Sequence, residues 1–205
     1  MTSFATLRSL TRKPPATERC DMCGAGLGHQ HQHLIDPVSR RLVCACDACA
    51  VLFYQSGETK YKRVPRRCRL LADFQMTDGQ WDSLMIPIGL AFFVESTPEK
   101  KTLALYPSPA GSTESMLSLE AWWDIVQENP VLAEMEADVE ALLVNRLDHT
   151  GEYYLAPIDK CYQLVGLISS NWRGLSGGTE VWTEVGRFMV DLKRKSGHEQ
   201  GDGHA

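Results

Sequence analysis

The sequence lacks an apolar run long enough to span a membrane. The longest such run, residues 86–94, is interrupted by Pro87 and Gly89 and falls short of the ~20 residues that a transmembrane helix needs. Residues 1–13 carry basic side chains but no continuous apolar block, so the core of a secretory signal is missing as well. We therefore expect a cytoplasmic protein without a membrane span.

The composition excludes a disordered chain, because 43% of the 205 residues are hydrophobic, enough to bury a sizeable core. The sequence also shows no convincing internal repeat. Charge is unevenly distributed, with a net charge of +7 over residues 1–69 and −12 over residues 70–205. Six of the seven cysteines lie in the basic part. We therefore expect a small metal module followed by a larger domain.

Catalytic motifs are missing from the acidic part. Its isolated Ser, His, Asp and Lys side chains do not have the spacing of a nucleophile elbow, a phosphate loop or a carboxylate pair. Cys161 falls on the apolar stripe of a predicted helix, where a free cysteine behaves as a small core residue. The sequence predicts no catalytic residue, and it favours a protein that is not an enzyme.

Two CxxC pairs carry the strongest chemical signal. Cys20 and Cys23 form the first pair, and Cys46 and Cys49 form the second after 22 intervening residues. Cytoplasmic thiols stay reduced, which favours metal ligation over disulfides. Two such pairs converge readily on one tetrahedral ion. The sequence predicts a four-cysteine site for zinc, with a structural role because four protein ligands leave no open position.

Mononuclear iron is the alternative ion at these four sulfurs. Cys23-Gly24 matches the knuckle of rubredoxin, in which glycine lets the backbone approach the sulfur, whereas Cys49-Ala50 departs from that pattern. The same sulfur tetrahedron accepts either ion. Composition therefore does not separate zinc from iron.

Further ligands lie close to these pairs in the sequence. We expect Cys44 to be the last inward residue of a strand, with an alternative ligand or a redox thiol as the other possibilities. His29, His31 and His33 alternate in an extended segment, so they share a face. One of them can replace a cysteine ligand, or they support the site by hydrogen bonding.

A basic stretch follows the second CxxC pair. Its six cations are Lys60, Lys62, Arg63, Arg66, Arg67 and Arg69. Such a cluster can contact nucleic acid phosphates, but the acidic remainder of the chain opposes that function. We expect these residues to form a solvated face, or to dock an acidic protein partner or the acidic domain of the same chain.

The predicted fold class is α+β, with a treble-clef or zinc-ribbon-like module followed by a mainly antiparallel sheet packed against helices. The expected regions are a disordered basic arm (1–18), the metal module (19–57), a basic connector (58–76), an α+β domain (77–195) and a disordered tail (196–205). The module should contain a hairpin joining Leu34-Ile35 to Leu42-Val43, and a helix over residues 46–54.

The α+β domain should contain two strand pairs and several helices. Strands are predicted at 89–95, 101–106, 139–146 and 153–157, with a loop over 107–112. Helices are predicted from Thr77, from Ser118, over 159–172 and over 179–194, with a short helical turn through Met135. The helix from Ser118 should bury Leu119, Trp122, Trp123 and Val126 on one face.

Several stretches together give the sequence a family resemblance. They are residues 20–24, 33–36, 42–49, 86–93, 106–111, 139–145 and 172–174. In these stretches the chain resembles a largely actinobacterial family of unknown function, whose genes tend to lie in nickel-iron hydrogenase clusters. The resemblance implies an accessory or maturation role beside a hydrogenase, and it places family cysteines at positions 20, 23, 44, 46 and 49. It carries over no enzymatic activity.

The leading hypothesis from the sequence is a metal-binding accessory protein that docks a hydrogenase component or its maturation machinery. One alternative is a rubredoxin-like iron protein that transfers electrons or protects against oxygen. The other is a zinc-finger regulator that binds nucleic acid through the basic stretch.

Overall fold

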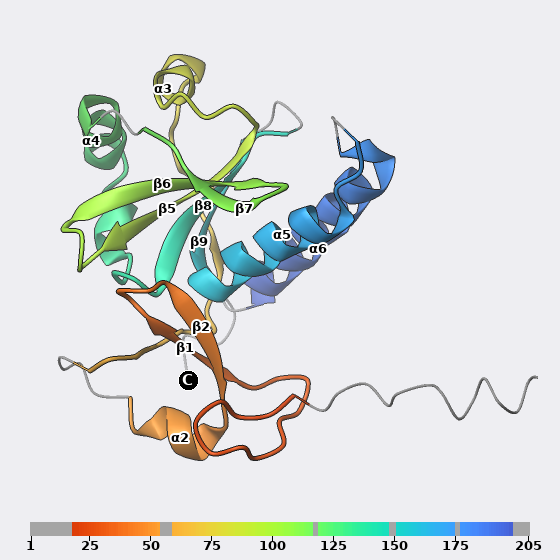
Figure 1. Cartoon of the computed structure of the whole chain (residues 1–205). Coiled ribbons are helices and arrows are strands. Elements are labelled where there is room, and N and C mark those ends of the chain that lie inside the picture. The colour runs from red at the N-terminus through yellow and green to blue at the C-terminus, as the bar shows by residue number, and fades with distance from the viewer. Residues whose placement is uncertain (1–17, 54–58, 117–118, 148–150, 175–176, 199–205) are drawn as a thin grey trace, which may run out of the picture. The chain divides into compact units, whose positions relative to one another are not determined.

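The computed structural model describes residues 18–53, 59–116, 119–147, 151–174 and 177–198 (Figure 1). These residues form two compact units: residues 18–36, 40–53 and 59–63 belong to the first, and residues 37–39 and 64–198 belong to the second. Every strand pair is antiparallel. The α+β class with antiparallel sheets is therefore confirmed. Nearly all of the expected basic arm, and the tail from residue 199, lie outside the described residues.

The first unit contains a three-stranded sheet and a short helix. Strands β1 (Gln32–Asp36) and β2 (Arg41–Ala45) form the predicted hairpin, and β3 (Lys62–Arg63) pairs with the other edge of β1. Helix α2 (Asp47–Val51) follows β2 directly. Strand β3 lies within the expected basic connector (58–76), so part of that connector belongs to this sheet.

The second unit is built on a six-stranded sheet with the order β4-β9-β8-β5-β6-β7. Its strands are β4 (Arg69–Leu70), β5 (Leu90–Ser96), β6 (Lys101–Ser108), β7 (Gly111–Glu114), β8 (Glu140–Asn145) and β9 (Glu152–Pro157). The two predicted strand pairs are confirmed. The loop prediction for residues 107–112 was wrong, because β6 continues to Ser108 and turns tightly into β7 at Gly111, where φ is +114°.

Helices cover both faces of this sheet (Figure 1). One face packs against α3 (Asp78–Ser83), α4 (Leu119–Glu128) and the 3₁₀ helix Pro130–Glu134. The other face packs against α5 (Ile158–Asn171), which runs alongside α6 (Gly178–His198). Adjacent residues of β5 point to opposite faces of the sheet. Phe93 therefore stacks on Trp122 of α4, while Phe92 contacts Tyr162 of α5 on the other face.

The buried face of α4 differs from the predicted one. Trp122 is 6% exposed and Ile125 is fully buried, whereas Trp123 is 62% exposed. Adjacent helical residues lie about 100° apart around the axis, so Trp122 and Trp123 cannot both point to the sheet. The core stripe runs through positions 122 and 125, and the expectation for Trp123 was wrong.

Each of the two C-terminal helices buries an apolar stripe. Cys161 is fully buried in α5, as expected of a core cysteine, and Val181, Val185, Met189 and Leu192 are buried in α6. Helix α6 extends to His198 with Ser196 buried, so the predicted tail does not begin at residue 196. In the described parts of the chain, none of the helices has the length and apolar character needed to cross a membrane.

Candidate metal centre

The four predicted cysteine ligands lie together in the first unit. Cys20 and Cys23 belong to the loop before β1, Cys46 is the N-cap of α2, and Cys49 lies in its first turn. All four Sγ atoms lie within 4.8 Å of one another. The structure therefore assembles one four-sulfur cluster from the two CxxC pairs.

Backbone hydrogen bonds shape the first CxxC loop. The Cys20 N–H donates to the Ala25 carbonyl at 2.8 Å, and the Gly24 N–H donates to the Cys20 carbonyl at 2.8 Å. Gly24 has φ +76°, in the left-handed region that glycine adopts without steric cost. The Asp21 N–H also donates to the Cys44 carbonyl at 2.8 Å. These bonds fold the loop tightly and tie it to β2.

The second CxxC pair depends on the start of α2. Cys46 is extended, with φ −74° and ψ 161°, and the helix begins at the next residue. Cys49 lies three residues further on, a spacing that brings side chains together on one side of a helical turn. Asp47 accepts a hydrogen bond from Gln32 of β1 at 2.8 Å. The helix start is thereby held against β1, the strand that follows the first pair.

The sulfur spacing fits a tetrahedral metal ion. The Sγ atoms of Cys23 and Cys46 lie 3.7 Å apart. With a Zn–S bond of ~2.3 Å, the edge of a tetrahedron of sulfurs measures about 3.8 Å, whereas a disulfide bond measures about 2.05 Å. No disulfide joins cysteines of the described residues. The donor set therefore fits zinc or another ion that accepts four thiolates.

The four thiols differ in acidity. Hydrogen bonds from backbone N–H groups, chiefly that of Cys46, lower the pKa of Cys20 to about 6 despite its burial. The pKa of Cys49 is raised to about 12. The largest cause is the hydrogen bond between its thiol and Cys46, and the next largest is the one with Cys23. Crowded sulfurs cannot all ionise without a compensating charge. A bound cation supplies that charge, so metal binding and full deprotonation are coupled.

The cluster lies at the edge of a small core. Cys20 is buried among Leu34, Val43, Ala45 and Ala50, whereas Cys23 is exposed and Cys46 and Cys49 are partly exposed. One side of the cluster is thus open to solvent.

Three of the four remaining predicted ligands form a separate group. His31, His33 and Cys44 each offer a ligand atom, and these atoms lie within 4.8 Å of one another. His29 is exposed and belongs to neither group.

Val43 and Ala45 are buried while Cys44 is only partly buried, so Cys44 faces away from the core. The expectation that it points inward was wrong by one strand position. Burial, followed by the charges of Asp21, Glu18 and Cys20, raises its pKa.

The six predicted partner-binding cations are divided between the units. Lys60, Lys62 and Arg63 belong to the first unit, and Arg66, Arg67 and Arg69 belong to the second. Lys60 lies over the ring of Tyr61, and Arg63 donates to Gln32 at 3.2 Å.

Two of these arginines bind carboxylates of their own unit. Arg67 donates to both oxygens of Glu140 at 2.7 and 2.9 Å, and Arg69 donates to Glu134 at 2.7 Å. The Glu140 side chain is 1% exposed, and its hydrogen bond raises the pKa of Arg67. Arg67 therefore neutralises a buried charge at the start of β8.

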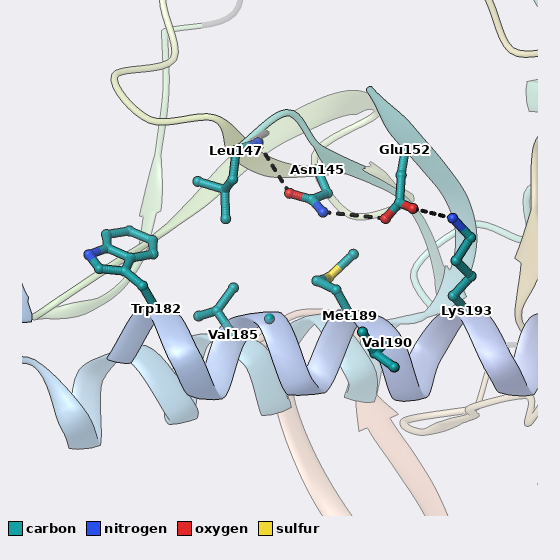
Figure 2. A pocket seen from close by; sticks show the side chains of 9 residues that line it. Asn145, Leu147, Glu152, Trp182, Val185, Met189, Val190 and Lys193 are labelled. Atoms are coloured by element: carbon teal, nitrogen blue, oxygen red, sulfur yellow. Dashed lines mark hydrogen bonds and ion pairs between the residues drawn. The ribbon is translucent and has the colours of Figure 1, made fainter. Parts of the chain in front are cut away.

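A pocket of ≈ 580 Å³ in the second unit was not predicted (Figure 2). Apolar side chains of α6, including Trp182, Val185 and Met189, form one wall. At its polar end Glu152 accepts from Lys193 at 2.6 Å and from Asn145 at 3.4 Å. Burial opposes the charge of Glu152, but these bonds and one from Tyr154 lower its pKa overall. The lining residues come from β8, from Leu147 just after it, from β9 and from α6, so no local sequence pattern marks this pocket.

A comparison with family models identifies the chain. The model described as a family of unknown function, DUF5947, matches residues 19–196. The chain belongs to the DUF5947 family. The matched DUF5947 region includes residues of both units, and with them the cysteine cluster and the six-stranded sheet. No curated protein and no solved structure matches the chain.

Proposed function

We propose that this protein is a zinc-binding accessory protein whose cysteine module has a structural role and whose basic residues dock a protein partner. The gathering of Cys20, Cys23, Cys46 and Cys49 into one cluster carries this proposal. The order of CxxC loop, hairpin and helix start supports a treble-clef module. Four protein sulfurs saturate a tetrahedral zinc ion, which favours a structural ion over a catalytic one.

The small core of the first unit supports the structural role. Its buried cluster consists of Cys20, Leu34, Val43, Ala45 and Ala50. Units of about 40 residues rarely bury enough apolar surface to fold without a metal or a disulfide. Zinc binding contributes folding free energy in such modules. We infer that the ion fastens the loop before β1 to the start of α2.

The proposed partner is a protein with an acidic surface. The family resemblance implies that it is a nickel-iron hydrogenase component or a maturation factor. The docking region consists of the six basic residues already named. Lys60, Arg66 and Arg67 are its exposed members, but Arg67 and Arg69 already bind carboxylates of the second unit. The proposal includes a cytoplasmic location, which the free thiols support because oxidising compartments favour disulfides.

Cross-linking in the native host tests the docking proposal. The full chain should yield cross-links from residues 60–69 to a hydrogenase subunit or maturation factor. Charge reversal in a Lys60→Glu/Arg66→Glu double variant should reduce these cross-links at least several-fold. Lys195→Glu, a reversal at an exposed position of α6, serves as the matched control. Unchanged cross-linking in the double variant, or none to any hydrogenase component, contradicts the proposal.

One observation favours a second candidate, an iron centre for electron transfer or oxygen protection. Cys23 is exposed and is followed by Gly24 in a left-handed conformation, and a redox ion needs such access from solvent. Thiolate-to-iron absorption in protein purified without oxygen would support this candidate. The nucleic-acid alternative is less favoured, because Arg67 and Arg69 are held by carboxylates.

A further inference from the structure

The hairpin of the first unit carries a second cluster of metal-ligating side chains. His33 of β1 is directly paired with Cys44 of β2, and His31 precedes His33 by two residues, the spacing that returns a side chain to the same face. The two imidazole rings meet edge to face, with centroids 4.7 Å apart. One nitrogen of each ring and the Cys44 Sγ lie within 4.8 Å of one another. None of the three belongs to the four-cysteine cluster.

His31 has one engaged and one unpartnered ring nitrogen, as a metal-binding histidine has before the ion binds. Its Nδ1 lies 3.0 Å from the Gly28 carbonyl and 3.5 Å from a Glu18 oxygen, while its side chain is 8% exposed. Its Nε2 is buried and has no hydrogen-bond partner among the described residues. Ligating imidazoles typically donate one N–H to a carbonyl or carboxylate and turn the other nitrogen to the ion. Leaving that nitrogen unsatisfied costs free energy, which an ion would recover.

The surroundings of the cluster favour a cation. The Cys44 N–H donates to an Asp21 carboxylate oxygen at 2.6 Å, and the Glu18 carboxylate lies beside His31. The four thiols of the neighbouring cluster carry a net negative charge when they bind a divalent ion. A cation bound to the hairpin, beside this cluster and the two carboxylates, would offset part of their negative charge.

We propose that His31, His33 and Cys44 form a second metal site for a borderline-soft transition-metal ion. Two imidazoles and one thiolate suit zinc, cobalt, nickel or copper better than they suit the hard ions magnesium and calcium. Three protein ligands leave one position of a tetrahedral ion open. The ion at this site is therefore exchangeable and open to an external ligand, unlike the ion at the four cysteines.

Cobalt binding to the full chain tests the second site. Protein that holds one equivalent of zinc per chain, the amount that the four cysteines bind, is titrated with Co²⁺ under anaerobic conditions, and absorption is recorded together with released zinc. We expect one further equivalent of Co²⁺ to bind without zinc release, giving the ligand-field bands of tetrahedral cobalt and one thiolate charge-transfer band. Added imidazole should shift these bands, because it takes the open position.

Three variants assign the signal. Cys44→Ser and His31→Gln should each lose the further equivalent while keeping the zinc and the wild-type circular dichroism; glutamine can still donate to the Gly28 carbonyl. His29→Gln, at an exposed histidine two residues away, should bind as wild type. The proposal is overturned if no further equivalent binds, if Cys44→Ser retains it, or if cobalt enters only by displacing zinc. A chain that holds no zinc at the outset contradicts the proposed function but not the second site. The second site is then still tested by whether a cobalt signal appears and is lost in Cys44→Ser.

Discussion

The Sγ atoms of Cys23 and Cys46 lie 3.7 Å apart although 22 residues separate them in the sequence. This distance matches the edge of a metal-centred tetrahedron of sulfurs, about 3.8 Å, and is far too long for a disulfide bond. The contact joins the loop before β1 to the start of α2. The fold of the first unit therefore depends on what holds these sulfurs together.

Replacing one cluster cysteine should remove the metal and unfold the first unit. Cys20→Ser deletes a buried ligand, so the ion loses a bond and the unit loses the folding free energy that the ion supplies. We expect less than one tenth of the wild-type metal content and fast hydrogen exchange over residues 18–63. Cys161→Ala, which removes a cysteine of α5, should keep the full metal content. Normal protection and full metal content in Cys20→Ser would exclude Cys20 as a ligand.

Arg67 and Arg66 should differ sharply in their effect on stability. Arg67→Ala leaves the buried Glu140 carboxylate without its two charge-assisted hydrogen bonds. The expected loss is ~1–3 kcal/mol in the free energy of unfolding, kept moderate by the half-exposed position of Arg67. Arg66→Ala, at an exposed neighbouring position, should change stability by less than ~0.5 kcal/mol. Urea denaturation of both variants measures the difference.

A second substitution separates the buried charge from other effects of losing Arg67. Glu140→Gln removes the charge that Arg67 neutralises, so it should recover part of the loss when added to Arg67→Ala. A double variant less stable than Arg67→Ala alone would contradict the ion-pair explanation.

The adjacent tryptophans of α4 provide another matched pair. Trp122 stacks on Phe93 with ring centroids 4.7 Å apart, so Trp122→Ala should cost ~3–5 kcal/mol. Trp123 is 62% exposed, and Trp123→Ala should change stability by less than ~0.5 kcal/mol. Thermal denaturation distinguishes the two, and equal effects would contradict the placement of the helix.

Glu152 should make the second unit sensitive to acid. Its pKa in the folded chain is lower than its ordinary value of 4.5, so the unfolded state binds protons more readily. Its stabilising contribution is therefore present above about pH 4.5 and is lost as pH falls through the lower folded value. Glu152→Gln should be less stable than wild type at pH 7, with the gap narrowing below pH 4.5. A gap that stays constant down to pH 3 would contradict the Lys193 pairing.

The sequence predicted the long elements because each has a clear apolar pattern. Short apolar runs bounded by turn residues marked β5, β6, β8 and β9, and helical spacing marked α5 and α6. The two-residue strands β3 and β4 lie in a basic stretch and are too short to show alternation. Strand β7 consists of Gly111–Glu114, whose polar residues resemble a loop.

The four-cysteine cluster was predictable because CxxC spacing is a local pattern. The second cluster was only partly predictable. Alternation placed His31 and His33 on one face, but pairing of His33 with Cys44 depends on the hairpin register, which the sequence did not specify. The pocket beside α6 depends on tertiary packing alone.

The most direct test of the account is the metal content of the full chain, purified from its own host without oxygen or added metal, together with its absorption spectrum. We predict at least one equivalent of zinc per chain, a colourless solution, and loss of that zinc in Cys20→Ser. Iron with thiolate-to-metal absorption would contradict the structural-zinc account in favour of a redox centre. The absence of any stoichiometric metal would contradict the metal centre itself.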